Sequence, residues 1–558
     1  MNRGLIVPAG VIDAASHCKF FAPITQHASN LELIRPERRA SEWELILHQA
    51  LADDALVHVQ EITKQVARGL SDELPGTIDT VCVPTRDRPK MLARLLTSLS
   101  SNLEASDRHV NVMVGDDSST PQLCAASRSI ASSKATRSMR VTYIGPEERG
   151  RFATGTARRA RVAPEIFSFA VLRNDPRHVA VGSMRNTLLL MSAGRRIMFI
   201  DDDVLCDITP IPGGRSDSIV GVRNDSTETW FLPKRPDASD LEVTGENVLE
   251  LFDAALNIRA LVTPPPWAGA IDPSTISISL LRKICEKPSA VVVSQIGVAG
   301  DCAMDFPLGY FTGGAADLDR LTASPDVYRA AMLNRAVIRG TTIFTLSNRL
   351  LAAGYCMGVD NRALLAPFLP SQRGEELVFG ALLTKCIRGA LISSIPRAIL
   401  HAPAQERRFE ASAMADRAGV FTASSTIARL IEAERMTASN SEDALRSMGH
   451  RLGELSRTND LDLNDAIRSA TDHVVCSLIV RLDSIASGNS VARYDARRAL
   501  AACIRNRGEW DYSVPFDLGK ENGRKQLRCL LGQLSLLLES WPAIFAAAKA
   551  QGEMSQSS

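Results

Sequence analysis

Three short apolar runs in the first half of the chain each end in a polar cluster, and this arrangement constrains the fold more than any other feature. The runs and the clusters that follow them are TVCV before PTRDRP at residues 80–89, VNVMV before GDDSST at residues 110–120, and IMFI before three aspartates at residues 197–203. Leucines at helical spacing follow the first cluster, so strands and helices alternate. We therefore expect an α/β fold with a mainly parallel, doubly wound sheet, in which ligands bind beyond the carboxyl ends of the strands.

The three consecutive aspartates give the strongest indication of chemistry. Side chains alternate along an extended chain, so Asp201 and Asp203 are predicted to face one side and Asp202 the other. Two carboxylates on one side suit Mn²⁺ or Mg²⁺, which usually keep several waters and take further ligands from substrate phosphates. A turn that ends the strand is the structural alternative, because aspartate is common in turns.

Four segments in a fixed order carry a resemblance to a known family. They are PTRDRP at residues 84–89, VGDDSST at 114–120, GSMRN at 182–186 and FIDDDV at 199–204. In this order and at this spacing they resemble the nucleotide-sugar half of the GT-A fold glycosyltransferases of the family-2 type. The resemblance covers residues from about 76 to 405. It implies a Rossmann-like core, an inverting reaction on a nucleotide-sugar and a DXD-type metal site.

The resemblance implies that the first two loops hold the nucleotide. Pro84, Thr85 and Asp87 would border it. Asp116 or Asp117 would accept a hydrogen bond from the uracil imide N–H, because a carboxylate makes a charge-assisted bond to such a donor. This implies a UDP-linked sugar as the donor. A solvated turn formed by the aspartates themselves is the structural alternative for the second loop.

The resemblance also implies where the diphosphate and the cation lie. Arg185 would lie against the nucleotide phosphates, where a planar guanidinium suits paired oxygens, or else it is an ordinary arginine on a helix surface. Asp201 and Asp203 would hold Mn²⁺ or Mg²⁺, which neutralises the departing diphosphate. Asp202, with Asp201, is expected beside the nucleotide-sugar, at the ribose or the sugar hydroxyls. His401 is the expected third metal ligand, with a histidine paired to a backbone group as the alternative.

The residue that would deprotonate the acceptor lies further along the chain. Glu375 and Glu376 open an apolar helical segment, in the place where the family has a Glu-Asp pair whose aspartate is the general base. Glutamate at position 376 departs from that pattern, although it carries the same acid and reaches one methylene further. Glu376 is the predicted base and Glu375 the alternative. Acidic residues also stabilise the first turn of a helix, which gives a purely structural explanation for the pair.

Composition excludes some classes of function. The formal charge of +1 argues against a nucleic-acid binder, which normally carries a basic excess. The eleven cysteines form no CxxC pair, and most of them, such as Cys82 and Cys476, lie in apolar runs. This predicts reduced, packed thiols and a cytoplasmic protein. No segment approaches the roughly 20 apolar residues of a membrane-spanning helix, so no membrane span is expected.

A chain of 558 residues is too long for one compact domain. The predicted division is an N-terminal helical extension at residues 1–75, a GT-A domain at 76–405 and an all-helical C-terminal domain at 406–558. One face of the last predicted helix carries a leucine stripe, formed by Leu527, Leu530, Leu531, Leu534, Leu537 and Leu538. Such a stripe is more often a contact with the core than a dimer seam, and a homo-oligomer through these helices is the alternative.

Together these features predict a metal-dependent, inverting glycosyltransferase that moves a sugar from a UDP-sugar donor to a hydroxyl of a glycan, peptide or small-molecule acceptor. A nucleotidyltransferase of related fold is an alternative, because such enzymes also bind nucleotides and metal through paired carboxylates. A non-catalytic scaffold that binds partners through the C-terminal helices is the alternative from a different class. The intact aspartate run and the intact acidic pair favour the glycosyltransferase.

Overall fold

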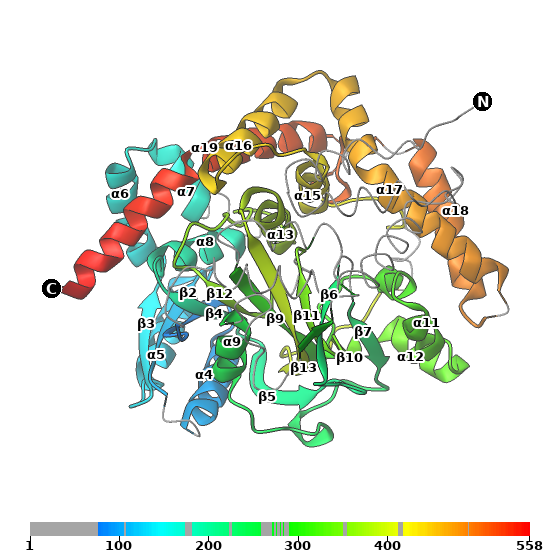
Figure 1. Cartoon of the computed structure of the whole chain (residues 1–558), viewed down its shortest axis with the longest axis horizontal. Coiled ribbons are helices and arrows are strands. Elements are labelled where there is room, and N and C mark those ends of the chain that lie inside the picture. The colour runs from blue at the N-terminus through cyan, green and yellow to red at the C-terminus, as the bar shows by residue number, and fades with distance from the viewer. Residues whose placement is uncertain are drawn as a thin grey trace, which may run out of the picture.

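The computed structural model describes residues 76–104, 108–172, 181–222, 226–257, 270–272, 275, 280, 283, 290–349, 354–410, 417–488, 490–509, 511–519 and 521–557. The N-terminal helical extension predicted at residues 1–75 lies outside these described residues. The described chain has an α/β structure with a helical C-terminal region, as predicted (Figure 1).

A single sheet runs through the middle of the molecule, and its described part contains thirteen strands. The strands are β1 (Thr80–Thr85), β2 (Val110–Asp116), β3 (Met139–Ile144), β4 (Arg196–Ile200), β5 (Val204–Pro210), β6 (Ser218–Val222), β7 (Glu228–Phe231), β8 (Ala270–Asp272), β9 (Ala290–Asp301), β10 (Ala336–Gly340), β11 (Phe344–Ser347), β12 (Cys356–Asp360) and β13 (Ala390–His401). The main order is β3-β2-β1-β4-β12-β9-β13-β11-β6-β8, while β5 pairs with β13, β10 with β9, and β7 with β10.

The sheet is mixed, which corrects the prediction that it is mainly parallel. Strands β3, β2, β1 and β4 form a continuous parallel block, in agreement with the alternation of strands and helices in this part of the sequence. In contrast, β12 is antiparallel to both β4 and β9, and β13 is antiparallel to β5 and β11. A crossover helix keeps successive strands parallel, but these strands meet partners remote in sequence, so local alternation does not determine their direction.

Helices cover both faces of the sheet (Figure 1). Along β4, the side chains of Ile197 and Phe199 belong to one buried cluster, the first core, and those of Met198 and Ile200 belong to another, the second core. Successive side chains of this strand therefore enter opposite cores. The helices of the second core are α4 (Pro89–Glu104), α5 (Pro121–Ser133) and α9 (Val248–Leu256). Those of the first core are α6 (Pro146–Ala160), α7 (Pro164–Val171), α8 (Val181–Met191) and α13 (Glu375–Cys386). The short helices α11 (Ala315–Leu321) and α12 (Pro325–Leu333) contact β7, and η3 (Pro307–Phe311) contacts α11. The short helix η1 (Ala238–Asp240) follows β7 along the chain.

The C-terminal region packs onto the first core. Its helices are α15 (Ala423–Ala433), α16 (Ser441–Arg457), α17 (Asp460–Ser487), α18 (Arg493–Glu509), η4 (Phe516–Leu518) and α19 (Gly523–Ser557). All six leucines of the predicted stripe on α19 are buried in the same cluster as Phe199 of the sheet. The indole of Trp541, also on α19, donates a hydrogen bond to the carbonyl of Leu365 at 2.7 Å. The stripe is therefore core, as favoured, and is not exposed for a dimer seam.

Helix α19 differs from the sequence expectation in one respect. Within the described residues it is the one helix long and apolar enough to cross a membrane. The most apolar window of Gly523–Glu553 has a mean hydropathy of 1.4, and 56% of that window is buried inside the molecule. A buried core helix passes the same test, so this finding is weak evidence for a membrane span.

The nine described cysteines are free thiols. Cys82 and five others are buried, as the apolar runs predicted. Cys476 is exposed, which corrects the expectation that it packs in the core. It lies on the solvent side of α17, whereas its neighbour Val475 faces inward.

Candidate functional site

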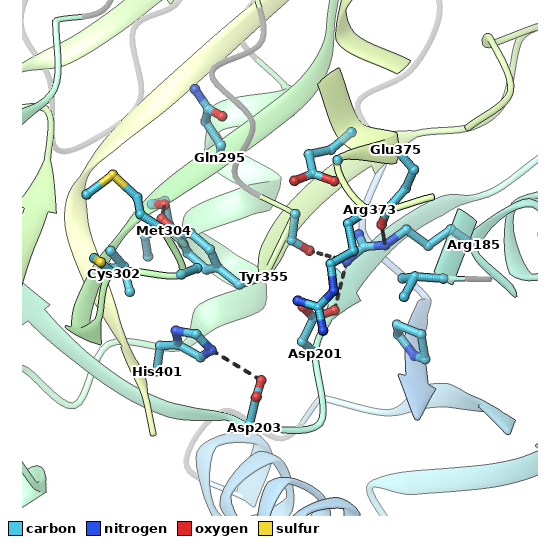
Figure 2. A pocket seen from close by; sticks show the side chains of 18 of the residues that line it. Arg185, Asp201, Asp203, Gln295, Cys302, Met304, Tyr355, Arg373, Glu375 and His401 are labelled. Carbon is cyan, nitrogen blue, oxygen red and sulfur yellow. Dashed lines mark hydrogen bonds and ion pairs between the residues drawn. The ribbon is translucent and has the colours of Figure 1, made fainter. Parts of the chain in front are cut away.

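A cavity of about 840 Å³ lies beside the ends of β1, β4 and β13 and the start of α13 (Figure 2). It brings together ten of the twelve predicted site residues, from segments more than 300 residues apart: Pro84, Thr85, Asp87, Asp117, Arg185, Asp201, Asp203, Glu375, Glu376 and His401. Asp116 and Asp202 do not line it. The tertiary structure therefore unites most of the residues that were singled out separately in the sequence.

The loops that follow β1 and β2 are tied together at one end of the cavity. Asp87 accepts hydrogen bonds from the backbone N–H and the hydroxyl of Ser119, at 2.6 and 2.9 Å. In return, the N–H of Asp87 donates to Ser118 Oγ at 3.0 Å. These bonds hold Asp87 at φ 56°, a left-handed conformation that costs an L-residue about 1 to 2 kcal/mol. Asp87 thus shapes the wall of the cavity as well as lining it.

The two aspartates after β2 have different environments. Asp116 is fully buried, where it accepts hydrogen bonds from Ser118 and, at 2.8 Å, from the hydroxyl of Tyr143. Burial and the hydrogen bond to Asp116 raise the pKa of Tyr143 well above its usual value. Asp117 lines the cavity and forms an ion pair of 2.7 Å with the buried Arg149. Of the two, Asp117 is the aspartate placed to meet a ligand.

The three aspartates form the turn between β4 and β5. Asp201 and Asp203 line the cavity, as the alternation predicted, and Asp202 is fully buried. Asp202 accepts a hydrogen bond from the Thr85 hydroxyl at 2.6 Å and lies 3.1 Å from Arg88. Burial raises the pKa of Asp202 to about 7. The predicted contact of Asp202 with a ribose or sugar is therefore replaced by contacts that hold the β1 loop, because its side chain points away from the cavity.

Asp203 and His401 form a pair within the cavity (Figure 2). The Nε2 atom of His401 lies 3.3 Å from Asp203 Oδ1, and Nδ1 lies 2.7 Å from the backbone carbonyl oxygen of Asp301. A carbonyl only accepts, so Nδ1 carries a hydrogen and Nε2 is the nitrogen aimed at the carboxylate. Burial lowers the pKa of His401, but Asp203 outweighs it and raises the pKa above its usual value. Burial opposes ionisation of Asp203, yet His401 and Arg88 hold its pKa well below its usual range.

Arg185 connects the aspartate turn with the acidic pair. This buried guanidinium donates to Asp201 Oδ1 at 2.8 Å and to the carbonyl of Gly354 at 2.7 Å, and its Nε lies 3.2 Å from a carboxylate oxygen of Glu375. Its Nη1 is also buried and has no hydrogen-bond partner among the described residues. The alternative prediction, that Arg185 is an ordinary arginine on a helix surface, is therefore wrong. Arg185 is a buried cation beside the cavity, and its Nη1 makes no hydrogen bond with the described residues.

A glycine makes this close packing possible. Gly182 lies at the start of α8, where a Cβ atom would be 1.8 Å from the carbonyl oxygen of Leu369 and 3.2 Å from the Cβ of Glu375. Only a residue without a side chain lets α8 approach the start of α13 so closely. The glycine of the GSMRN segment therefore allows Arg185, three residues later, to reach Glu375.

The acidic pair begins α13, as predicted, and both carboxylates line the cavity. Glu375 is only 4% exposed, and burial together with the charge of Glu376 raises its pKa well above the usual value, although Arg185 opposes this. Glu376 is half-buried. The pair thus consists of an accessible carboxylate, Glu376, and a buried one, Glu375, that Arg185 holds in place.

The donors in the cavity have the chemistry that a divalent cation requires. Asp201 and Asp203 supply carboxylate oxygens, and His401 supplies a ring nitrogen. Arg185 engages one oxygen of Asp201, and no described residue forms a hydrogen bond with the other. The described residues as they stand contain no group of three or more histidine, cysteine or acidic side chains arranged as a metal centre. The donors fit a cation provided that Arg88, which is 46% exposed and pairs with Asp203, moves aside.

Arginines are the main feature of the cavity that the sequence analysis missed. Besides Arg185, the cavity is lined by Arg86, Arg88, Arg339, Arg349, Arg373 and Arg407. Arg373 lies two residues before Glu375 and reaches into the cavity in Figure 2. Guanidinium groups suit phosphate oxygens. The position of Arg373 just before the acidic pair was a signal in the sequence, and Arg86 and Arg88 lie in the PTRDRP segment. Arg339, Arg349 and Arg407 come from separate segments that share no motif.

Backbone strain concentrates around the cavity. Four described residues other than glycine have a positive φ, and among them Asp87 and Ala303 line the cavity while Gln372 precedes Arg373. Such conformations persist only where the surrounding structure holds them, and they cluster at ligand sites. The strain independently supports the cavity as the functional site.

Comparison with known proteins does not assign a family. No protein-family model matches the chain, and no curated protein matches it.

Proposed function

We propose that this protein is a metal-dependent, inverting glycosyltransferase that moves a sugar from a UDP-linked donor to a hydroxyl of an acceptor. The observation that carries the proposal is that Arg185 joins the aspartate turn to the acidic pair, at 2.8 Å from Asp201 and 3.2 Å from Glu375. A glycosyltransferase needs a site for the departing diphosphate and a base for the acceptor within one small volume. The cavity contains candidates for both.

In this proposal the nucleotide occupies the end of the cavity formed by the β1 and β2 loops. Asp117, held by Arg149, accepts the imide N–H of uracil in a charge-assisted hydrogen bond. Thr85 lines the same end. Arg88 and Arg373 supply positive charge for the diphosphate, and a phosphate that attracted Arg88 would release it from Asp203.

The chain's own residues then perform the proton transfer. Asp201, Asp203 and His401 would hold a divalent cation, which when bound supplies Lewis-acid stabilisation of the departing diphosphate. Glu376 accepts the proton of the acceptor hydroxyl as its oxygen attacks the anomeric carbon, a contribution of about 10²- to 10⁴-fold for a general base. Glu375 is a positioning residue in this scheme, because it is buried against Arg185.

A thermal-shift titration tests the proposal. UDP, GDP, CDP and ADP are each added with and without Mn²⁺ to the native protein and to the Asp117→Asn, Asp203→Asn and Asp217→Asn variants. A ligand specific for the folded state adds about 2.7 kcal/mol of stability at 100 times its Kd. For the native protein, we expect the largest increase in unfolding temperature with UDP and Mn²⁺ together. In Asp117→Asn, the increase with UDP is expected to exceed that with the other nucleotides by less. In Asp203→Asn, the increase with UDP is expected not to depend on Mn²⁺.

Asp217 is the control, because its side chain is 64% exposed and it does not line the cavity. Its variant is expected to behave like the native protein. If no nucleotide shifts the unfolding of the native protein, the donor site is wrong and the scaffold becomes the better account.

A further inference from the structure

Two buried polar groups that line the cavity have no hydrogen-bond partner among the described residues. The amide of Gln295 on β9 donates from Nε2 to Ser394 Oγ at 3.0 Å, but its Oε1 is unpartnered. The hydroxyl of Thr341, directly after β10, is also unpartnered. Gln295 is 4% exposed and Thr341 2%, and both line the cavity. A buried polar group without a partner costs about 1 to 3 kcal/mol, so a ligand that pairs with it gains affinity.

These groups lie in a different part of the cavity from the nucleotide loops. In the sheet, β9 is separated from β1 by β4 and β12. Figure 2 shows Gln295 on the Tyr355 side of the cavity, away from Arg185. A Cβ on Gly297 of β9 would lie 3.0 Å from the Cα of Gly340 on β10, so the two strands approach closely there. Because Thr341 follows Gly340 and Gln295 lies two residues from Gly297, the two unpartnered groups share one wall.

The chemistry of the two groups selects the kind of ligand. The oxygen of an amide only accepts hydrogen bonds, so Oε1 of Gln295 needs a donor. A phosphate or carboxylate presents acceptors and does not satisfy it. A hydroxyl both donates and accepts, so one hydroxyl can pair with Gln295 and another can pair with Thr341 in either direction.

We infer that Gln295, Thr341 and Ser394 form a subsite for a neutral, hydroxyl-rich group, namely the sugar of the donor. This inference rests on the proposed function, which places a sugar beside the diphosphate. A sugar hydroxyl donates to Gln295, and a second one pairs with Thr341. A site built to hydrogen-bond a hydroxyl rejects an analogue that lacks it, because its buried polar groups are then left unpaired. These residues determine which sugar binds and take no part in proton transfer.

The test uses Gln295→Met and Thr341→Val, which keep side chains of similar size and remove the polar groups. Binding of UDP and of a panel of UDP-hexoses, all with Mn²⁺, is measured by calorimetry on the full chain. We expect the native protein to bind one UDP-hexose more tightly than UDP. Each variant is expected to keep its affinity for UDP and to lose about tenfold in affinity for that UDP-hexose, the size of one lost hydrogen bond.

Ser294→Ala and Ser393→Ala are matched controls. Both serines are fully buried and have unpartnered hydroxyls, and they adjoin Gln295 and Ser394, but neither lines the cavity. They are expected to leave the affinity for both ligands unchanged. Thermal unfolding of free Thr341→Val gives a second readout, because removing an unpartnered polar group leaves the unfolding midpoint unchanged or raises it. Gln295→Met is not used for this readout, because it also removes the hydrogen bond from Nε2 to Ser394.

The outcomes separate the two proposals. One outcome is that the native protein binds UDP and that both Gln295→Met and Thr341→Val keep the preference for the UDP-hexose over UDP. In that case the subsite is wrong and the proposed function stands. If Thr341→Val unfolds at a much lower temperature than the serine controls, the Thr341 hydroxyl has a partner in the free protein and the subsite is wrong. If neither UDP nor any UDP-hexose binds the native protein, the proposed function fails and the subsite falls with it.

Discussion

Arg149 and Asp117 form an ion pair of 2.7 Å, and the arginine side chain is only 3% exposed. Arg149 also donates to the carbonyl oxygen of Val171, so its guanidinium is held by the backbone as well as by the carboxylate. The pair holds Asp117 at the wall of the cavity, whereas Asp116 pairs with Tyr143 in the interior. An arginine outside every recognised motif thus takes part in deciding which of two adjacent aspartates meets a ligand.

Arg149→Met is expected to weaken UDP binding about tenfold, because Asp117 loses the partner that orients it. Calorimetry on the folded variant measures this. The control is Arg128→Met, since Arg128 is 49% exposed and pairs with Glu148 on the same helix as Arg149. It is expected to leave the affinity unchanged. An equal loss in both variants would contradict a specific role for Arg149.

Gly182→Ala is expected to lower the free energy of unfolding by about 2 to 3 kcal/mol, as measured by urea denaturation. A methyl at this position would lie 1.8 Å from the carbonyl oxygen of Leu369 and 3.2 Å from the Cβ of Glu375, so α8 must shift away from the segment before α13 and from the start of that helix. Gly150→Ala in α6 is the matched control, because nothing lies within 4 Å of its Cβ position. There, the same change is expected to stabilise the helix by about 0.5 to 1 kcal/mol. Similar effects at both glycines would refute the close approach of α8.

Leu534→Ala is expected to cost about 2 to 5 kcal/mol of stability, because its side chain is fully buried in the core shared by α19 and the sheet. Leu536, two residues further along the same helix, is 50% exposed. Leu536→Ala is therefore expected to change the stability by less than about 0.5 kcal/mol. Urea unfolding followed by circular dichroism compares the two variants. A larger loss at Leu536 would indicate that α19 packs with its other face inward.

The free protein is expected to lose stability as the pH rises above the normal range of a glutamate. Burial, and then the charge of Glu376, raises the pKa of Glu375 in the folded protein above its value of about 4.3 in the unfolded chain. The folded state therefore binds the carboxyl proton of Glu375 more tightly than the unfolded state does. Its contribution to stability is complete below about pH 4.3 and is lost as the pH rises through the folded pKa.

Glu375→Gln, which cannot ionise, is expected to flatten that part of the pH–stability curve, measured by urea denaturation between about pH 4 and 8. Glu521→Gln serves as the control, because Glu521 is exposed. It is expected to leave the slope unchanged. If the native protein and Glu375→Gln show the same slope, Glu375 is ionised throughout and the assignment is wrong.

Local periodicity was sufficient to predict particular elements. Leucines at helical spacing after Pro89 form the buried face of α4, and the leucine stripe near the C-terminus forms the buried face of α19. Both predictions succeed because a helix that covers a core must present one apolar face to it. Strand direction beyond β4 could not be predicted in this way, because β12 and β13 meet partners that no local pattern specifies.

The sequence by itself determined which chemical groups the site offers and how neighbouring side chains divide between two sides of the chain. Asp201 and Asp203 face the cavity and Asp202 the interior, the division that alternation along the chain predicted. The backbone there is a turn, closed by a hydrogen bond from the N–H of Val204 to the carbonyl oxygen of Asp201. Only the tertiary structure decided which groups meet. The bond of Arg185 to Asp201 and its approach to Glu375, like the burial of the unpartnered amide oxygen of Gln295, depend on segments far apart in the chain that are brought together when both cores are packed.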